Sequence, residues 1–181
     1  MGTVGCVTGP GTLNWRPADA DLVAAPVVDA LTGWGRTDVL AAPIEADLAD
    51  TAAFCAHYGV ELADSANCVV IAGRRGEATR YAACVVLATT RADVNGVVRR
   101  RLDARKASFA AMDEAVALTG MEYGGITPIG LPTGWPVLID RAVLERGMVV
   151  IGSGLRRSKI ALPPDALAEL PGAEVVDGLA G

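Results

Sequence analysis

The spacing of apolar and polar residues predicts short helices and short strands in alternation. Residues 17–31 place apolar side chains on one helical face, with Gly33 as the stop and Pro26 as a flaw that shortens or bends the helix. Residues 38–44 are extended in character. A second helix is expected over residues 47–58, with the aspartate at its first position as the cap and a glycine directly after it.

Strands dominate the next part of the chain. Residues 67–72 (NCVVIA) and 80–89 (RYAACVVLAT) are apolar runs joined by GRRGEAT, and this pattern predicts a β-hairpin. After Asp93, the segment VNGVVRRRL predicts a short basic helix interrupted by Gly96. The other expected elements are a brief strand at 106–110, a short helix at 113–118 ended by Gly120, buried strands at 137–140 and 148–154, a last strand near 158–162, and a helix begun by Pro163 and Pro164.

This succession favours an α/β fold in which a mixed β-sheet curls into a barrel-like form with helices around it. The sequence lacks the long βαβ periods of a Rossmann-type sheet. We expect residues 1–37 to form an N-terminal extension that carries the first helix, and residues 38–181 to form the main domain, both within one compact globule.

Composition narrows the class of protein. Of the 181 residues, 51% are apolar but only 4% are aromatic, so aliphatic side chains must fill the core. No apolar run approaches the ~20 residues that cross a bilayer, and residues 1–15 lack the basic start and apolar stretch of a signal peptide. We therefore expect a cytoplasmic globular protein without a membrane partner, and the sequence indicates no oligomeric state.

Charge is negative in total but unevenly distributed. The net charge of −5 argues against indiscriminate nucleic-acid binding. Two basic clusters interrupt this balance, and such runs serve either as solvated surface or as contacts to phosphate groups. The first cluster comprises Arg99, Arg100, Arg101, Arg105 and Lys106, and the second comprises Arg156, Arg157 and Lys159.

The four cysteines form neither a disulfide framework nor a metal pattern. Cys6, Cys55, Cys68 and Cys84 are widely spaced without a CxxC pair, and the last two lie in apolar runs that are typical of buried thiols. Cys55 and His57 remain candidates for thiol or metal chemistry, but they project about 200° apart on a helix, and His57 is the only histidine. We expect neither a metal site nor an organic cofactor.

One segment combines little side-chain chemistry with unusual backbone freedom. It is YGGITPIG, residues 123–130, which holds three glycines and a proline. Glycine allows the backbone to approach a ligand closely and to adopt positive φ, so several N–H groups can converge on one oxygen atom. The segment is therefore either an ordinary turn or a site that holds a carbonyl oxygen through its backbone.

The order of these features resembles the YbaK/prolyl-tRNA synthetase-associated domain family. The paired strands, an ARK-type basic turn, YGGITPIG, VLID and VVIGSGLRR follow one another as in that family, and the resemblance covers about residues 51–176. It implies the family's fold and an aminoacyl-tRNA deacylase activity, which hydrolyses the ester between an amino acid and the 3′ end of a mischarged tRNA. It also implies that no side-chain nucleophile takes part and that the tRNA's own ribose hydroxyl helps to position or activate water.

The resemblance further implies a set of site residues. Backbone amides of the glycine loop would hold the ester carbonyl, and each such donor stabilises an oxyanion by about 3–4 kcal/mol. The first basic cluster would grip the tRNA acceptor end, with Arg156 and Arg157 as secondary contacts. Asp140 has a second interpretation, because an aspartate that ends a strand also caps a following helix. The implied catalytic loop comprises Gly124, Gly125, Ile126, Thr127, Pro128 and Gly130, and the implied substrate-binding residues are Asn67, Asp140, Gly152, Ser153 and Gly154.

One position departs from the family pattern. Active members carry a lysine early in the strand that reads NCVVIA here, and alignment of the apolar run places Asn67, or its neighbour Cys68, at that point. Asparagine still donates a hydrogen bond but lacks the positive charge, and charge-assisted hydrogen bonds are roughly twice as strong as neutral ones. Arg80 or a residue of the basic cluster is left as a spatial substitute.

Three hypotheses about function therefore stay open. The first is an aminoacyl-tRNA editing hydrolase that acts in trans on the acceptor end of tRNA, with an aminoacyl-tRNA synthetase as a further partner. The second is a catalytically weak or inactive module that binds an aminoacyl or nucleotide ligand, or a synthetase, through the inherited pocket. The third is a metal-dependent or thiol enzyme built around Cys55 and His57. The sequence does not determine which amino acid is removed or which tRNA is recognised.

Overall fold

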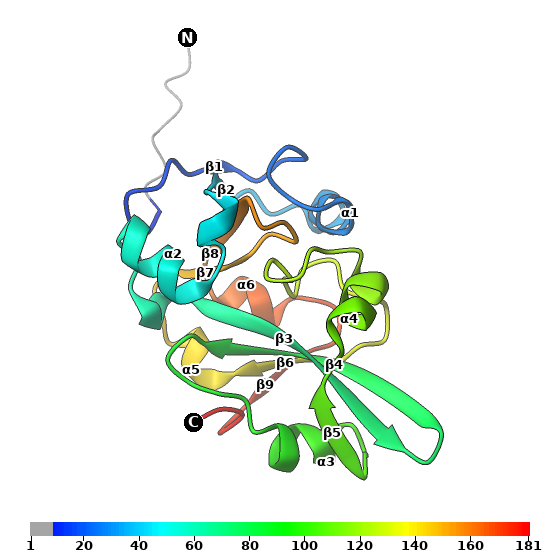
Figure 1. Ribbon diagram of the computed structural model, residues 1–181. Coiled ribbons are helices and arrows are strands. Elements are labelled where there is room, and N and C mark those ends of the chain that lie inside the picture. The colour runs from blue at the N-terminus through cyan, green and yellow to red at the C-terminus, as the bar shows by residue number, and fades with distance from the viewer. Residues whose placement is uncertain (1–8) are drawn as a thin grey trace.

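Two β-sheets organise the protein (Figure 1). The computed structural model describes residues 9–181. Cys6 and the first part of residues 1–15, which lack the pattern of a signal peptide, therefore lie outside the described residues. The strands are β1 (Arg16–Pro17), β2 (Leu40–Pro43), β3 (Ala66–Arg75), β4 (Ala78–Leu87), β5 (Lys106–Phe109), β6 (Val137–Asp140), β7 (Val149–Gly152), β8 (Ser158–Leu162) and β9 (Ala173–Val176). The helices are α1 (Ala25–Trp34), η1 (Ala46–Leu48), α2 (Thr51–Tyr58), η2 (Leu62–Asp64), η3 (Val94–Val98), α3 (Arg99–Arg101), α4 (Met112–Thr119), α5 (Arg141–Leu144) and α6 (Asp165–Ala168).

The strand order confirms the α/β class and the mixed sheet. One sheet has the order β1-β2-β8-β7 with antiparallel neighbours, and the other has the order β5-β3-β4-β6-β9. The second sheet is mixed, because β6 is parallel to both β4 and β9. A parallel bridge between Ser65 and Val150 links the two sheets. The strands are thus divided between two open sheets, instead of curling into one barrel-like sheet.

The first helix begins later than the sequence predicts. α1 starts at Ala25, and Pro26 occupies its first turn, where the missing N–H group has no intrahelical partner to lose. Pro26 therefore starts the helix and does not bend it. Gly33 lies inside α1, and the helix ends at Gly35, whose φ of 74° is left-handed. Pro17, expected in the helix, lies in β1 instead.

The cap of the second helix also differs from the prediction. Asp50 caps α2 by accepting hydrogen bonds from the amides of Ala52 and Ala53, at 3.1 and 3.4 Å. Asp47, which was expected to be the cap, lies in η1. The predicted stop at Gly59 is confirmed, with a φ of 69°.

The hairpin is confirmed with a longer ladder than expected. β3 and β4 pair from Ala66↔Leu87 to Arg75↔Ala78, so the connecting turn shrinks to two residues. The VNGVVRRRL helix divides into η3, a π-helical turn capped by Asp93, and α3. β5, α4, β6, β7, β8 and α6 lie close to their predicted positions, whereas β9 was not predicted.

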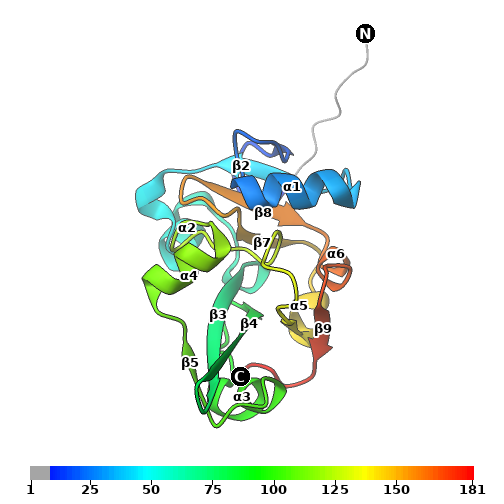
Figure 2. The ribbon, with the colours of Figure 1, turned by 90° about the vertical axis from the view of Figure 1, so that its right-hand side faces the viewer.

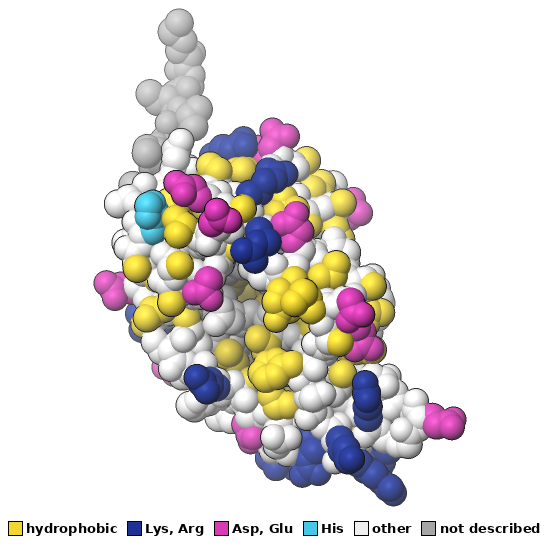
Figure 3. All heavy atoms as spheres, in the orientation of Figure 1, with side chains coloured by type: hydrophobic (Ala, Val, Ile, Leu, Met, Phe, Trp, Pro, Cys, Tyr) yellow, Lys and Arg dark blue, Asp and Glu magenta, His cyan; other side chains and the backbone are white. Residues whose placement is uncertain are grey.

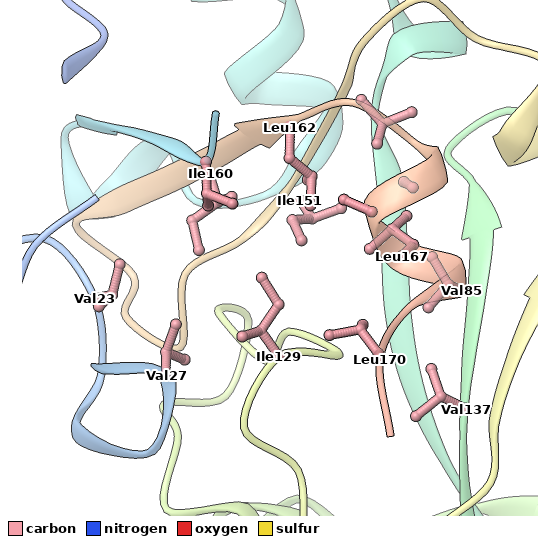
Figure 4. Packing of buried hydrophobic residues seen from close by; sticks show 14 of the residues in the cluster. Val23, Val27, Val85, Ile129, Val137, Ile151, Ile160, Leu162, Leu167 and Leu170 are labelled. Carbon is pink, nitrogen blue, oxygen red and sulfur yellow. The ribbon is translucent and has the colours of Figure 1, made fainter. Parts of the chain in front are cut away.

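The main core lies between the two sheets. Its largest cluster joins Ile151 and Ile160 of the four-stranded sheet to Val85 and Val137 of the five-stranded sheet. Figure 4 shows Ile129 among these side chains, and Figure 2 shows the segment between α4 and β6 passing between the levels of the two sheets. This segment contains the glycine loop, so burial of Ile129 anchors the loop in the core.

The segment before β2 contributes to the same core. Leu22, Val23 and Val27 are buried in the cluster between the sheets. The domain boundary at residue 37 stays a prediction. In the described part of the chain, no helix is long and apolar enough to cross a membrane.

Candidate active site

A cavity of about 370 Å³ opens between the start of β3 and the glycine loop. Its floor and walls come from segments that are distant in sequence: the start of α2, the β3 strand, the end of β5, the glycine loop, and the β7 and β8 strands. The lining residues are Ala49, Asp50, Thr51, Ala66, Asn67, Cys68, Val69, Val70, Phe109, Ala110, Ala115, Tyr123, Gly124, Ile126, Gly152, Arg156 and Lys159. The cavity is therefore mostly apolar with a few polar groups, as in ligand sites generally.

Two amides of the glycine loop are free at this cavity. Gly124 and Ile126 line it, and in residues 9–181 neither amide donates a hydrogen bond to a protein acceptor. Gly125 does not line the cavity, and its amide donates to the carbonyl of Glu122 at 2.9 Å, as in an ordinary turn. Gly124 has a φ of 85°, which favours glycine. Of the implied loop residues, Gly124 and Ile126 thus combine a place in the cavity lining with an amide that has no protein acceptor in the described chain.

The second glycine turn supports the loop from behind. The Gly154 amide donates to the Gly125 carbonyl at 2.7 Å, and the Glu122 amide donates to the Gly154 carbonyl at 2.8 Å. A Cβ atom on Gly152 would lie 2.3 Å from the Gly125 oxygen, so the close approach requires glycine. Gly152 lines the cavity, whereas Gly154 does not.

Ser153 fixes this second turn from the buried side. Its hydroxyl lies 2.7 Å from the Ser158 hydroxyl and donates to the Leu155 and Ser158 carbonyls at 3.2 and 3.1 Å. Ser158 in turn donates to the Leu22 carbonyl at 2.6 Å. Ser153 is fully buried away from the cavity, so the structure gives it a supporting position in place of the implied substrate contact.

The rest of the glycine loop turns away from the cavity. Thr127 is fully buried, and its hydroxyl has no hydrogen-bond partner within the described chain. Pro128 and Gly130 line a different hollow of about 700 Å³, next to Trp34 and Trp135. These three residues, implied as part of the catalytic loop, therefore do not face the cavity that Gly124 and Ile126 line.

Asn67 lines the cavity from β3. Its side-chain oxygen accepts a hydrogen bond from the Thr51 hydroxyl at 2.8 Å, which fixes the orientation of the amide. Within residues 9–181 the Nδ2 group of Asn67 has no protein acceptor, so two N–H donors are left for a ligand. The implied position of Asn67 beside the glycine loop agrees with this geometry.

Two cations also line the cavity, and Arg80 is not one of them. Arg80 lies at the far end of the hairpin, close to Asp103. Arg156 spans the rim, where its guanidinium donates to the carbonyls of Tyr123 and Ala46 at 3.4 and 3.1 Å. Lys159 lies deeper, with 6% of its surface exposed. The sequence left Arg80 or a residue of the basic cluster as a substitute for the family lysine, but it did not indicate that Lys159 lines this cavity.

Asp140 lies outside the cavity and ties two chain segments together. One carboxylate oxygen accepts from the Ala142 amide at 2.9 Å, which caps α5, and the other accepts from the Ala180 amide at 2.7 Å. Both oxygens are therefore engaged by the backbone. Asp140 thus caps α5, as the second interpretation expects, and it is not among the residues that line this cavity.

The first basic cluster lies at the far end of the five-stranded sheet. Figure 3 shows Lys and Arg side chains gathered where β5 and α3 lie in Figure 1. Three arginines there form ion pairs: Arg75 and Arg80 share Asp103, and Arg101 pairs with Glu174. In the described part of the chain, four others have no carboxylate partner and line one hollow of about 560 Å³, which we call the basic groove: Arg74, Arg99, Arg105 and Lys106.

One further hollow lies between the basic groove and the cavity and shares lining residues with each. Asn95 lines both the basic groove and a neighbouring hollow, and that hollow shares Asn67, Val69 and Phe109 with the cavity. Phe109 is 63% exposed at this junction. Arg100 is exposed outside the basic groove, and Arg157 lies elsewhere, where it donates to the Asp21 carbonyl at 2.7 Å.

Among the described cysteines, Cys55 does not form a reactive pair with His57. Cys55 is buried and lies 3.3 Å from the Ser65 hydroxyl, whereas His57 is exposed and packs edge-on against Tyr58. Burial raises the pKa of Cys84 to about 12 and raises the pKa of Cys68 as well, so both thiols stay protonated at neutral pH. These positions leave the thiol-enzyme hypothesis without its catalytic pair.

Solved structures share this architecture. A candidate trans-editing enzyme for prolyl-tRNA synthetase superposes with a TM-score of 0.72 at 24% identity, over 84% of this chain and 93% of that one. A hypothetical protein superposes with a TM-score of 0.74 at 24% identity, over 86% of this chain and 99% of that one. The fold is therefore the α/β fold of the trans-editing type.

The sequence identifies the family more closely. A family model described as the aminoacyl-tRNA editing domain matches residues 45–170, which is more than half of the chain. The protein belongs to the aminoacyl-tRNA editing domain family, and the resemblance drawn from the sequence is confirmed. Aminoacyl-tRNA editing in general is accordingly the activity that family membership assigns to this chain.

Proposed function

We propose that the protein hydrolyses the ester of mischarged aminoacyl-tRNA in trans, in the cytoplasm, and that backbone amides of the glycine loop bind the ester carbonyl. The observation that carries this proposal is the pair of unpartnered amides, Gly124 and Ile126, on a concave surface opposite Asn67. The tight packing of Gly152 against the loop holds these amides in place. Fixed amides need no reorganisation when negative charge develops on the oxygen.

The chemistry follows from these groups. As water adds to the ester, the carbonyl oxygen gains negative charge, and each preorganised amide lowers the barrier by about 3–4 kcal/mol. The Asn67 side chain donates to the nucleoside end of the substrate, and the ribose hydroxyl of the tRNA positions water. No metal, organic cofactor or side-chain nucleophile is required, because an ester needs less activation than an amide.

The basic groove gives the acceptor strand a route to the cavity. Its four unpaired cations suit phosphate groups, and the hollow that follows leads past Phe109 to the cavity. An exposed aromatic ring at that junction suits stacking on an unpaired base of the 3′ end. An aminoacyl-tRNA synthetase is a further partner in this proposal, as the source of the mischarged tRNA.

A panel of mischarged tRNAs tests the activity. The purified protein should deacylate at least one of them above the buffer rate, and Gly124→Ala should reduce that rate, since a Cβ there would lie 2.7 Å from the Arg156 guanidinium. Gly134→Ala is the matched control, because Gly134 has a similar φ of 86° but open space around it. If every aminoacyl ester is hydrolysed only at the buffer rate, the proposal that the protein is a deacylase is refuted.

Salt dependence tests the route of the tRNA. Each phosphate contact contributes a slope of about −1 to the dependence of log affinity on log salt, so Arg105→Ala should make the slope shallower by about one. Arg75→Ala is the control, since Arg75 lies at the same end but outside the basic groove, where it forms an ion pair with Asp103. Equal slopes for the two variants would place the acceptor strand elsewhere.

Asn67 supports a second candidate function, a module that binds an aminoacyl or nucleotide ligand with little turnover. The neutral amide lacks the charge of the family lysine at this point of β3. Tight binding of a non-hydrolysable aminoacyl-adenosine without hydrolysis by the wild-type protein would favour the module. Faster hydrolysis by Asn67→Lys would then identify the missing charge as the cause.

A further inference from the structure

Lys159 enters the cavity from a strand that the glycine loop does not belong to. It lies in β8, opposite Gly152 of β7 and Ala42 of β2. Its side chain is 6% exposed and lines the same cavity as Gly124 and Ile126. Lys159 is thus a buried residue that shares its cavity with the amides proposed to bind the ester carbonyl.

The ammonium group is poorly neutralised for a buried cation. Its Nζ donates to the Ala49 carbonyl at 3.0 Å and lies 5.2 Å from the centre of the Phe54 ring. Among the residues that the structure describes, no carboxylate forms an ion pair with it. An ammonium group has three N–H donors, so Ala49 leaves two of them without an acceptor. A buried charge without a partner destabilises the folded protein, so a purely structural role explains Lys159 poorly.

Arg156, the other cation at the cavity, is placed differently. It is exposed, and its guanidinium donates two hydrogen bonds, to the carbonyls of Tyr123 and Ala46. Arg156 therefore lies at the exposed rim, whereas Lys159 is a buried cation whose ammonium group has one acceptor, Ala49, in the described chain.

We propose that Lys159 is the catalytic cation of this site: its ammonium group donates to the ester carbonyl oxygen together with the Gly124 and Ile126 amides. This inference rests on the proposed function and adds to it the charge that Asn67 lacks. The positive charge binds the developing oxyanion more strongly than the neutral carbonyl, so its contribution is to the rate and not to substrate affinity. The cation of the site comes from β8 and not from β3.

The surroundings of Lys159 set the pH range in which it is charged. Burial lowers its pKa, Cys55 and Asp50 raise it to a smaller extent, and Arg156 lowers it. The paired positions on the neighbouring strands, Ala42 and Gly152, carry no titratable group. The enzyme-dependent rate should therefore fall at alkaline pH as Lys159 loses its proton, and this fall should begin below the pH at which an exposed lysine titrates.

The kinetic test compares Lys159→Met and Lys159→Arg with Lys106→Met in single-turnover deacylation, with the buffer rate subtracted at each pH. Lys159→Met should lower the saturated rate about 10²–10³-fold, as the loss of one oxyanion donor does. Lys159→Arg should keep part of the rate and move its alkaline fall to higher pH, because guanidinium stays charged. Lys106→Met should instead raise the tRNA concentration needed for saturation.

A second readout uses the lysine content, since Lys106 and Lys159 are the only lysines of the chain. In protein labelled with ¹³C at lysine Cε, a non-hydrolysable 3′-aminoacylamido-adenosine should shift the Lys159 signal and leave the Lys106 signal in place. Thermal unfolding of each variant shows whether it is folded.

The outcomes separate the two proposals. If the wild-type protein deacylates tRNA and folded Lys159→Met keeps the wild-type rate and pH profile, the inference about Lys159 is overturned while the proposed function stands. An unmoved Lys159 signal with bound analogue has the same consequence. A wild-type protein inactive on every ester overturns both.

Discussion

Gly152→Ala tests whether the glycine loop depends on the backbone packed behind it. The added Cβ would lie 2.3 Å from the Gly125 carbonyl oxygen and 2.6 Å from the Ile126 oxygen, whereas ordinary contact begins at 3.4 Å. Both obstacles are backbone atoms, so no side-chain rotation relieves the overlap. The φ of Gly152 is not in the left-handed region, and the cost is therefore steric alone.

The Gly152→Ala substitution should affect both the stability of the protein and the rate of deacylation. Overpacking of this kind destabilises a protein by about 1–3 kcal/mol, which urea denaturation measures as a lower midpoint at unchanged slope. The overlap requires the loop to move by roughly 1 Å, and displacements of that size at a catalytic group cost up to about 10²-fold in rate. Single-turnover deacylation by the folded variant measures the second effect.

Gly33→Ala is the matched control. Gly33 lies inside α1 with no heavy atom within 4 Å of an added Cβ, and alanine is about 1 kcal/mol more favourable than glycine in a helix. This variant should be slightly more stable and fully active. Wild-type stability in Gly152→Ala would refute the steric reasoning, and a destabilised variant with the wild-type rate would show that the loop position does not control catalysis.

Three further outcomes are expected. Thr127→Val should raise the free energy of unfolding by about 1 kcal/mol, because the buried hydroxyl of Thr127 has no partner in the described chain; a loss of stability in urea would indicate that the hydroxyl is satisfied after all. Phe109→Ala should weaken tRNA binding in fluorescence anisotropy by about 1–3 kcal/mol if a base stacks there, whereas Met112→Ala, exposed nearby but outside the cavity, should not. Burial lowers the pKa of Lys159 below its ordinary value of 10.5, so the unfolded chain binds more protons between these two pKa values, and the stability of the wild-type protein relative to Lys159→Met should rise with pH across that window. A stability difference that stays flat with pH would contradict burial as the cause.

Local interactions explain where prediction from the sequence succeeded. The hairpin was predicted from two apolar runs around a Gly-rich connection, and the end of α2 was predicted from Gly59. Both features depend on residues that are neighbours along the chain. The first residue of a helix could not be predicted where two residues were equally suited to cap it. Asp47 and Asp50 both suit a helix cap, and only the path of the chain decides which one meets free amides.

For the candidate site, too, the sequence predicted the local motif but not its long-range contacts. The glycine pattern located the loop but did not distinguish Gly124 and Ile126, which line the cavity, from Gly125, whose amide closes a turn. The pattern also gave no sign that Ser153 and Asp140 would bind backbone groups instead of facing the cavity. Each outcome depends on which distant segment packs against the loop.

Sequence by itself determined the family, the α/β class, the hairpin and the position of the glycine loop, because these follow from short-range pattern and motif. Tertiary structure alone decided which groups meet in the cavity. Lys159 donates a hydrogen bond to the carbonyl of Ala49, 110 residues away along the chain. It lines the same cavity as Asn67, although the two residues belong to different sheets. Such meetings depend on how two sheets pack, and packing is a property of the whole core that no local segment encodes.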